Sequence, residues 1–354
     1  MENNASQLEG KERASVLLEL AGVHFSRQDR GAAMEALQRA LEGGDLPFDS
    51  LVRAGRENPS FTELCEAAAR EAARLREWNV SEEMLSLTIE TAPPENRVQL
   101  LRKRAAIRRG RLEDREGALQ DLLDVRGAGG LATPELEELL DMLQSRGDLE
   151  EAARVALELA ESTGWDGPRV ARAARLFQEV GDRDRARDLW RRAVGANPDP
   201  SSTIALVSLL DPTADGEEMS ALMESLRGKE ELLDIPEHLA LLEAGVDLDL
   251  ARGQELEAVE GLAAMMDLDP GRRDPWQKMV NILERRGEWE ALTKRMAQRQ
   301  EQAEAPDDVA RTAMALGRIL EEKLGDEDGA VRAFERVVEV LPEHQGANAA
   351  LARI

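Results

Sequence analysis

The sequence contains one cysteine, three histidines and no tyrosine, and aromatic residues make up only 3% of its 354 positions. A single cysteine excludes a disulfide within the chain. Cys65 lies in the run Leu64-Cys65-Glu66-Ala67-Ala68, where we expect it to face the interior from a helix as a small hydrophobic residue. Because aromatic side chains are scarce, the core must consist mainly of leucine, alanine, valine and methionine.

Basic residues are the minority: 46 Lys and Arg against 71 Asp and Glu give a net charge of -25. An acidic balance of this size argues against broad contact with nucleic-acid phosphates and against docking on an anionic membrane. It favours solubility and basic partners.

Long apolar runs are also missing. The opening Met1-Glu2-Asn3-Asn4 is polar and is not followed by the apolar stretch of a signal peptide. No run reaches the ~18 apolar residues of a membrane helix. We therefore expect a cytoplasmic protein with no membrane insertion. The basic residues are nearly all arginine, and alanine and glycine are abundant, which suggests a GC-rich bacterial gene.

Motifs with known chemistry are absent as well. The sequence has no phosphate-binding Gly-x-x-x-x-Gly-Lys-Ser/Thr loop, no Gly-x-Gly-x-x-Gly after a strand and no Gly-x-Ser-x-Gly elbow. His24, His238 and His344 lie far apart, and none has a second His or Cys at metal-ligand spacing. Acidic pairs such as Glu217-Glu218 fit a solvated helix face. The sequence predicts no catalytic residue, cofactor or metal, and hence no enzyme.

The sequence does contain a short Gly-Asp motif that recurs about every 34 residues. Gly147-Asp148, Gly181-Asp182 and Gly325-Asp326 are each followed by an alanine at the same distance. Looser copies begin at Gly216, Gly253 and Gly287. Repeats of this length cannot bury their apolar faces alone, so they stack into a solenoid.

The copy from Gly167 to Pro200 shows the expected local structure. Its apolar positions are Val170, Ala173, Ala174 and Phe177, then Ala186, Trp190 and Ala193. Both sets follow the spacing of one helix face. Gly181-Asp182 provides the end of one helix and the N-cap of the next, and Pro198 ends the second helix. Small alanines at the facing positions predict a closely packed helical hairpin.

These features resemble the tetratricopeptide repeat, whose first helix carries a Leu-Gly pair and whose second carries alanine and an aromatic residue before a proline. Leu316-Gly317, Ala330, Phe334 and Pro342 fit that pattern, and Trp276, Trp289 and Trp78 take aromatic positions. The resemblance covers most of the chain. It implies an all-α fold, a right-handed α-solenoid of helix-turn-helix repeats that forms a single superhelix over residues 1–354.

Nine approximate repeats are expected, at 14–47, 62–95, 98–131, 133–166, 167–200, 202–235, 239–272, 273–306 and 310–343, with the start of a tenth at 344–354. Ser81 takes the small-residue position of the second repeat, and Pro212 shortens the first helix of the sixth. Two stretches, 46–60 and 127–133, are expected to be long turns or joints in the array.

The last seven residues contain Leu351 and Ile354, which do not form the polar outer face of a capping helix. We expect the chain to be a fragment of a longer bacterial repeat protein. The alternative is a short terminal helix that packs on the ninth repeat.

In tetratricopeptide arrays the first helices line a concave surface that binds protein segments, so the resemblance implies a partner site there. By register it comprises Glu137, Asp141, Gln144, Arg175, Gln178, Glu243, Asp247, Gln277, Asn281, Glu284 and Arg318. One branch of the family clamps a terminal carboxylate with Lys, Arg and Asn. Asn281 matches that pattern but Gln277 and Glu243 do not, so such a clamp is not expected. Acidic stretches suit a helix or segment that carries Arg or Lys.

The sequence thus predicts a non-catalytic scaffold or adaptor that binds partner proteins through the concave face. Two alternatives stay open. One is a structural solenoid that self-associates through its C-terminal end, and the other is the regulatory arm of a larger enzyme or signalling protein.

Overall fold

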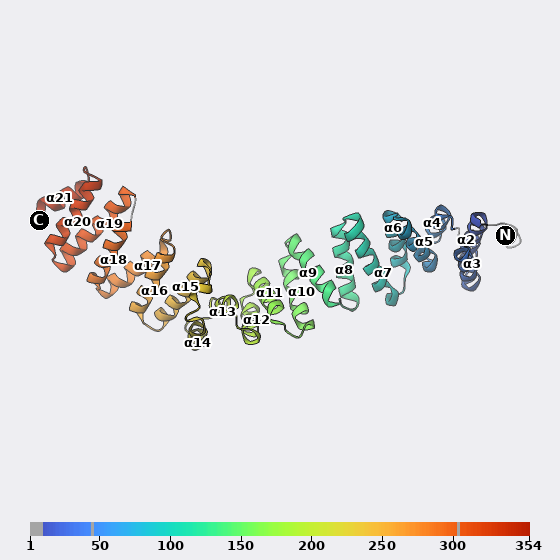
Figure 1. The fold of residues 1–354 in the computed structure, drawn as a ribbon, viewed down its shortest axis with the longest axis horizontal. Coiled ribbons are helices and arrows are strands. Elements are labelled where there is room, and N and C mark those ends of the chain that lie inside the picture. Colours follow the sequence, from blue (N-terminus) through green and yellow to red (C-terminus); the bar gives the residue numbers. More distant parts are fainter. Residues whose placement is uncertain (1–9, 44–45, 303–304) are drawn as a thin grey trace. The chain divides into compact units, whose positions relative to one another are not determined.

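The computed structural model describes residues 10–43, 46–302 and 305–354, and this part of the chain contains helices and turns but no β-strand (Figure 1). The chain divides into two compact units, Met1–Ala196 and Asn197–Ile354. Within the described ranges, none of the helices is both long and apolar enough to cross a membrane.

The first unit is a row of helical hairpins with one additional helix. Its hairpins are α2 (Gly10–Ser26) with α3 (Arg30–Glu42), α5 (Thr62–Leu75) with α6 (Trp78–Thr91), α7 (Pro94–Ile107) with α8 (Arg115–Gly129), α9 (Thr133–Arg146) with α10 (Leu149–Ser162), and α11 (Gly167–Glu179) with α12 (Arg183–Ala196). The additional helix α4 (Phe48–Glu57) packs on α2, α5 and α6. The hairpins α5–α6, α9–α10 and α11–α12 lie within the ranges 62–95, 133–166 and 167–200, whereas α2 and α7 begin at Gly10 and Pro94, before the expected starts at 14 and 98.

The second unit begins with short helices and continues as hairpins. It comprises α13 (Pro200–Val207), α14 (Gly216–Leu226), α15 (Ile235–Ala251) with α16 (Glu255–Leu268), α17 (Asp274–Arg286) with α18 (Trp289–Gln302), α19 (Pro306–Ile319) with α20 (Glu327–Val340), and α21 (Gln345–Arg353). A single 3-10 turn, Glu230–Leu232, precedes α15. The helix α21 packs on α20.

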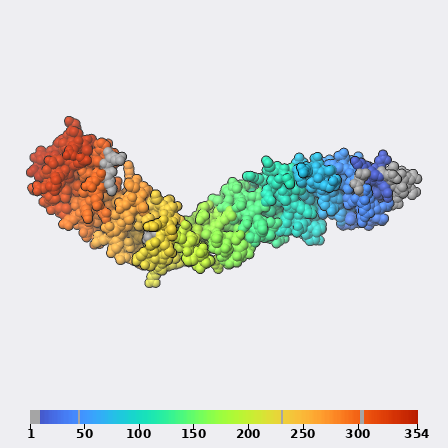
Figure 2. All heavy atoms as spheres, viewed as in Figure 1, coloured from blue at the N-terminus to red at the C-terminus, as the bar shows by residue number. Residues whose placement is uncertain are grey.

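Within each unit the hairpins pack against their neighbours in sequence, and in the space-filling view the colours follow the chain in order (Figure 2). Each unit is therefore a solenoid, in which a repeat buries its apolar face against the next repeat. The all-α solenoid expected from the repeat pattern is confirmed.

The turn between the two helices of a hairpin has the structure that the Gly-Asp motif predicts. Gly181 and Gly325 have φ of 83° and 65°, a left-handed conformation that favours glycine. The next residue caps the second helix: Asp182 accepts a bond from the Arg185 N–H at 3.2 Å, and Asp326 accepts one from the Gly329 N–H at 2.9 Å. Three earlier hairpins adopt the same left-handed turn without glycine, at Gln28, Arg76 and Glu113.

The hairpin core is narrow because small residues occupy the facing positions. Ala174 and Ala186 are fully buried, next to the larger Phe177 and Trp190. Ser81, in the small-residue position of the second repeat, is also buried, and its hydroxyl donates to the Ala69 carbonyl at 2.9 Å. This bond satisfies the buried hydroxyl, so serine serves as the small residue there.

One of the two stretches expected to be long turns or joints is mostly a helix. The stretch 46–60 contains the helix α4 rather than a long turn, with Pro47 as its N-cap and Asn58 as its C-cap. Leu51 of this helix is fully buried, and Gly55 is also buried. The break expected at 127–133 is present but shorter, because α8 continues to Gly129 and α9 begins at Thr133, which leaves residues 130–132 between them.

Two first helices are extended by a π-helical turn. Arg108–Leu112 continues α7 and Leu320–Leu324 continues α19. In both, an aspartate N–H reaches back six residues, from Asp114 to the Arg108 carbonyl and from Asp326 to the Leu320 carbonyl, each at 2.9 Å. The same local structure therefore closes the longer helix at two places in the chain.

Each π-helical turn presents a cation to a tryptophan of the preceding repeat. Arg111 lies over the Trp78 ring at 5.0 Å, and Lys323 lies over the Trp289 ring at 5.4 Å. Both tryptophans are the first residue of a second helix, α6 or α18. The extension thus supplies a cation–π contact between consecutive repeats.

Candidate functional site

Ion pairs join the first helices of consecutive repeats. Arg102 of α7 binds both carboxylate oxygens of Glu135 on α9, at 2.6 and 2.9 Å. Arg169 of α11 binds Glu137 on α9 at 2.6 Å. These pairs join residues 32 and 33 positions apart, about one repeat length, and so connect equivalent helices of consecutive hairpins.

A parallel set of pairs joins the second helices. Arg126 of α8 binds Glu158 of α10 at 2.7 Å, and Arg295 of α18 binds Glu260 of α16 at 2.8 Å. Exposed pairs of this kind contribute little stability one by one, of order 0–1 kcal/mol. The two sets of pairs show that, within each unit, first helices lie beside first helices and second helices lie beside second helices.

Three of the predicted site residues in the first unit are held within the protein. Glu137 accepts from Arg169, and Asp141 accepts from Arg172 at 2.6 Å. Gln144 also accepts from Arg172. The structure brings these three residues together along α9, facing the arginines of α11.

The remaining two predicted residues of this unit differ from each other. Gln178 accepts from the indole N–H of Trp190 at 3.2 Å, so it contacts the second helix of its own hairpin. Arg175 is exposed, and no hydrogen bond or ion pair joins its side chain to the rest of the described chain.

The second unit holds six predicted residues. Glu243 accepts from Arg272 at 2.6 Å, and the Gln277 amide donates to Asn281 at 3.1 Å on the same face of α17. The other three are the exposed residues Asp247, Glu284 and Arg318. Across residues 197–302 and 305–354, no side chain pairs with these three by hydrogen bond or ion pair.

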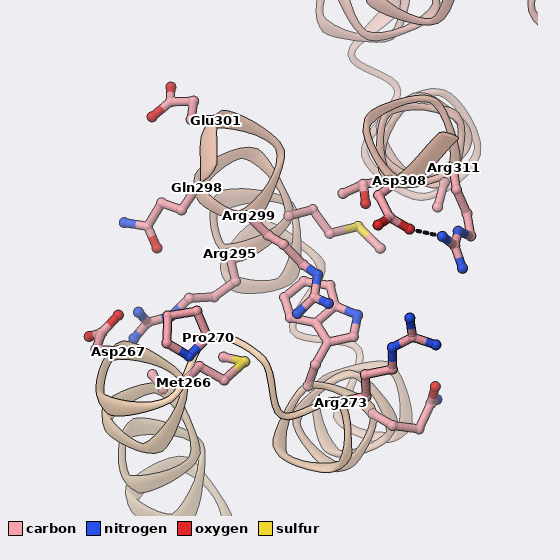
Figure 3. Close-up of a pocket in the computed structure, with 16 residues that line it drawn as sticks. Met266, Asp267, Pro270, Arg273, Arg295, Gln298, Arg299, Glu301, Asp308 and Arg311 are labelled. Atoms are coloured by element: carbon pink, nitrogen blue, oxygen red, sulfur yellow. Dashed lines mark hydrogen bonds and ion pairs between the residues drawn. The ribbon is translucent and has the colours of Figure 1, made fainter. Parts of the chain in front are cut away.

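A hollow of about 640 Å³ opens in the second unit between α16, α17, α18 and α19 (Figure 3). It lies beside the α17–α18 hairpin, whose helices pack on each other less extensively than those of α15–α16 and α19–α20. Part of its wall is apolar: Ala263, Met266, Pro270, Trp276, Met296 and Ala315.

Arginine dominates the charged part of this pocket. Arg299 lies over the Trp276 ring at 4.6 Å. Partial burial lowers the pKa of Arg299, and the nearby positive charges of Arg273 and Arg311 lower it further. Figure 3 shows Arg299 between Arg273 and the Asp308–Arg311 pair on one side and Arg295, Asp267 and Glu301 on the other.

This cluster was not predicted from the sequence, although two signals were present. Arg295 and Arg299 are four residues apart, which places them on one face of α18. Arg272-Arg273 follows Pro270-Gly271 at a turn. The neighbourhood of Arg311 could not have been read from spacing alone, because it lies one repeat further along.

No nucleophile is exposed for chemistry at Cys65. Its side chain is fully buried in α5, and burial raises the pKa of the thiol to about 11, so the reactive thiolate is disfavoured. Among the residues that the structure describes, no group of three or more His, Cys, Asp or Glu could hold a metal ion.

Comparison with known proteins gives a likeness of fold. No protein-family model matches the chain, and no curated protein matches it either. Among solved structures, the complex of Naa15/Naa10 bound to HypK-THB contains a chain that is 11% identical, with a TM-score of 0.51 over 96% of this chain. This chain spans 60% of the length of that one.

Two bacterial structures are also similar. A tetratricopeptide repeat protein from Parabacteroides merdae is 13% identical, with a TM-score of 0.39 over 72% of this chain and 97% of its own. The protein pilF of Pseudomonas aeruginosa is 17% identical, with a TM-score of 0.38 over 63% of this chain and 97% of its own. The chain has an α-solenoid fold of stacked helical hairpins, as its motifs predict, and the Naa15/Naa10 chain is similar in fold.

Proposed function

We propose that this chain is a non-catalytic scaffold that binds partner proteins through the face formed by its first helices. One observation carries the proposal: Arg175, Asp247, Glu284 and Arg318 are exposed on first helices and have no ionic or hydrogen-bonding partner in the described chain. Neighbouring positions such as Glu137 and Glu243 are already engaged by arginines. The unengaged side chains are the ones available to a partner.

The charge of the chain supports a partner segment that carries arginine or lysine. The net charge is -25, and Asp247 and Glu284 are unengaged acids on α15 and α17. Complementary charge of this kind raises the association rate and selects among partners. A helix laid along the first helices is one form such a segment can take. A cytoplasmic location and a bacterial origin stay predictions from composition.

Photo-crosslinking tests the face that is used. The variants Arg318→p-benzoylphenylalanine and Glu284→p-benzoylphenylalanine place the crosslinker on first helices α19 and α17. Glu335→p-benzoylphenylalanine places it at an exposed position on the second helix α20 and is the control. We expect a protein adduct in cells from the first two variants and not from the control. Adducts of equal yield at all three positions, or none, would contradict the proposal.

Self-association is the second candidate, favoured by apolar exposure at α21. Ile354 is 41% exposed, and Leu351 is half-buried. Light scattering of the purified chain over a range of concentrations tests it. A mass that stays at 39.0 kDa at the highest concentration rules it out.

A further inference from the structure

The pocket between α16 and α19 concentrates positive charge in an acidic protein. Arg273 precedes α17, Arg299 belongs to α18 and Arg311 belongs to α19. Arg273 and Arg299 have no acidic partner in the described chain. Arg311 is paired with Asp308 on its own helix.

Nearby arginines of the same unit behave differently. Arg272 binds Glu243, Arg285 and Arg286 bind Glu255, and Arg295 binds Glu260. Although the chain has more carboxylates than basic groups, Arg273 and Arg299 have no ion-pair partner in the described chain, and both lie near Arg311. Like charges held close together repel each other, and an anion placed among them would remove that repulsion.

The apolar surface of the pocket indicates which kind of group lies next to the anionic group in a bound ligand. The Trp276 ring, under the Arg299 guanidinium, joins Met266 and Met296 in an apolar wall. Methionine side chains adapt to irregular apolar groups. The pocket therefore offers an apolar contact and a cationic contact side by side, which suits a peptide better than a free inorganic anion.

We propose that this pocket binds a segment of a partner protein in which a Glu or Asp side chain meets Arg273 and Arg299 while an adjacent apolar side chain lies on Trp276 and the two methionines. The inference rests on the proposed scaffold function and adds a partner chemistry opposite in sign to that expected for the exposed acids.

A carboxylate fits better than a phosphate. Asp267, Glu301 and Asp308 also line the pocket, and a dianionic group would meet stronger repulsion from them than a single negative charge. Arg311 already donates to one carboxylate, that of Asp308. Arg273 and Arg299 are therefore left to bind a single carboxylate group of the ligand.

The test uses capped nonapeptides as probes, each with an N-acetyl and a C-amide group so that the central residue alone carries charge. The centre is Leu-Glu, Leu-Gln, Leu-phosphoserine or Leu-Lys in otherwise identical neutral sequences. Binding to the full chain is followed by NMR, from the arginine Nε–Hε signals and the Trp276 indole signal, assigned with Arg299→Gln and Trp276→Phe.

We expect the Glu peptide to shift the Arg299 and Trp276 signals with saturation and to bind at least ~10-fold more tightly than the Gln peptide. The Lys peptide should not bind. Arg273→Gln and Arg299→Gln should each weaken the Glu peptide by roughly 3–10-fold, as expected for a charge-assisted hydrogen bond in a partly exposed site. Arg336→Gln, at an exposed arginine of α20 paired with Glu339, is the matched control and should have no effect.

Equal binding of the Glu and Gln peptides, or tighter binding of the phosphoserine peptide, would overturn the proposal, and so would a failure of all four to bind. Because Arg273 is exposed, its variant keeps the test valid if Arg299→Gln unfolds. The crosslinking experiment separates the two ideas: an adduct at Arg318, together with a failure of the Glu peptide to bind, would leave the scaffold standing and remove the pocket.

Discussion

The ring of Phe334 packs directly on Gly317: a Cβ added to Gly317 would stand 2.5 Å from the Phe334 Cε1 atom. Phe334 is fully buried in α20, and Gly317 is buried in α19. The glycine of the Leu-Gly pair is therefore needed for space, since its helical backbone would accept any residue. This contact sets how closely the two helices of that hairpin approach.

Gly317→Ala should destabilise the second unit by about 1–3 kcal/mol, the usual result of overpacking a core. The loss should occur although alanine is the better helix former by about 1 kcal/mol. Urea unfolding followed by circular dichroism measures it. Gly127→Ala is the control, because Gly127 is helical in α8 and nothing lies within 4 Å of the added Cβ. That variant should be neutral or more stable, and a stabilised Gly317→Ala would show that the helices separate freely.

Asp121 is the buried centre of an ion-pair network in the first unit. Its carboxylate is fully buried and accepts from Arg104 at 2.6 Å and Arg108 at 3.1 Å. Asp121→Asn should cost about 3–5 kcal/mol, because it leaves two arginines without their shared charge in a poorly solvated site. Asp124→Asn, on the exposed side of the same helix, should stay within about 0.5 kcal/mol. Similar midpoints for both variants in urea would contradict the role given to Asp121.

Cys65 should resist modification in the folded chain. Burial raises the pKa of its thiol to about 11, so little thiolate forms at pH 8, and the sulfur lies against the Gly55 carbonyl of α4. A thiol reagent such as DTNB should react slowly with the native chain and rapidly in urea.

The raised pKa stabilises the fold below the unfolded value of about 8.5, and this contribution falls as pH rises toward 11. Cys65→Ala should flatten the alkaline limb of the stability profile, and rapid native labelling at pH 8 would show that α4 separates from α5.

Glu135 should contribute to acid sensitivity. Burial alone would raise the pKa of Glu135, but bonds from Arg102 and from the Ala132 N–H together hold it below the ordinary value. The stability it adds is therefore complete above the unfolded pKa and is lost as pH falls through the lower folded pKa. Glu135→Gln should reduce the pH dependence of unfolding in that acidic range. Glu150→Gln, at a largely exposed carboxylate, should leave the profile unchanged, and identical profiles for both variants would refute the assignment.

The hairpins were predictable because each repeat carries its own helix stripe and its own turn. Gly181-Asp182 and Gly325-Asp326 form the turns expected of them. The helix α4 was not predictable from the same reasoning, because Pro47 and Pro59 suggested an irregular stretch. In the structure Pro47 is the N-cap and Pro59 follows the C-cap residue, so they bound a helix that they seemed to exclude.

The predicted site was harder, because a helix position does not reveal what reaches it from the next repeat. Glu137 and Arg175 both lie outward on first helices, yet only Glu137 is engaged, by an arginine 32 residues further along. That engagement depends on the stagger of two hairpins, which arises from packing. The arginine pocket depends on the same stagger, since Arg299 and Arg311 come from consecutive repeats.

The two π-helical turns have a consequence for how such a chain tolerates change. In both places the additional length ends in a left-handed residue and an aspartate cap, so the second helix starts as it does in a shorter repeat. Insertions at the tip of a hairpin can therefore accumulate without moving the hairpins that follow. A sequence search that assumes a fixed repeat length would therefore lose the register of the repeats at these positions, although the hairpin architecture continues.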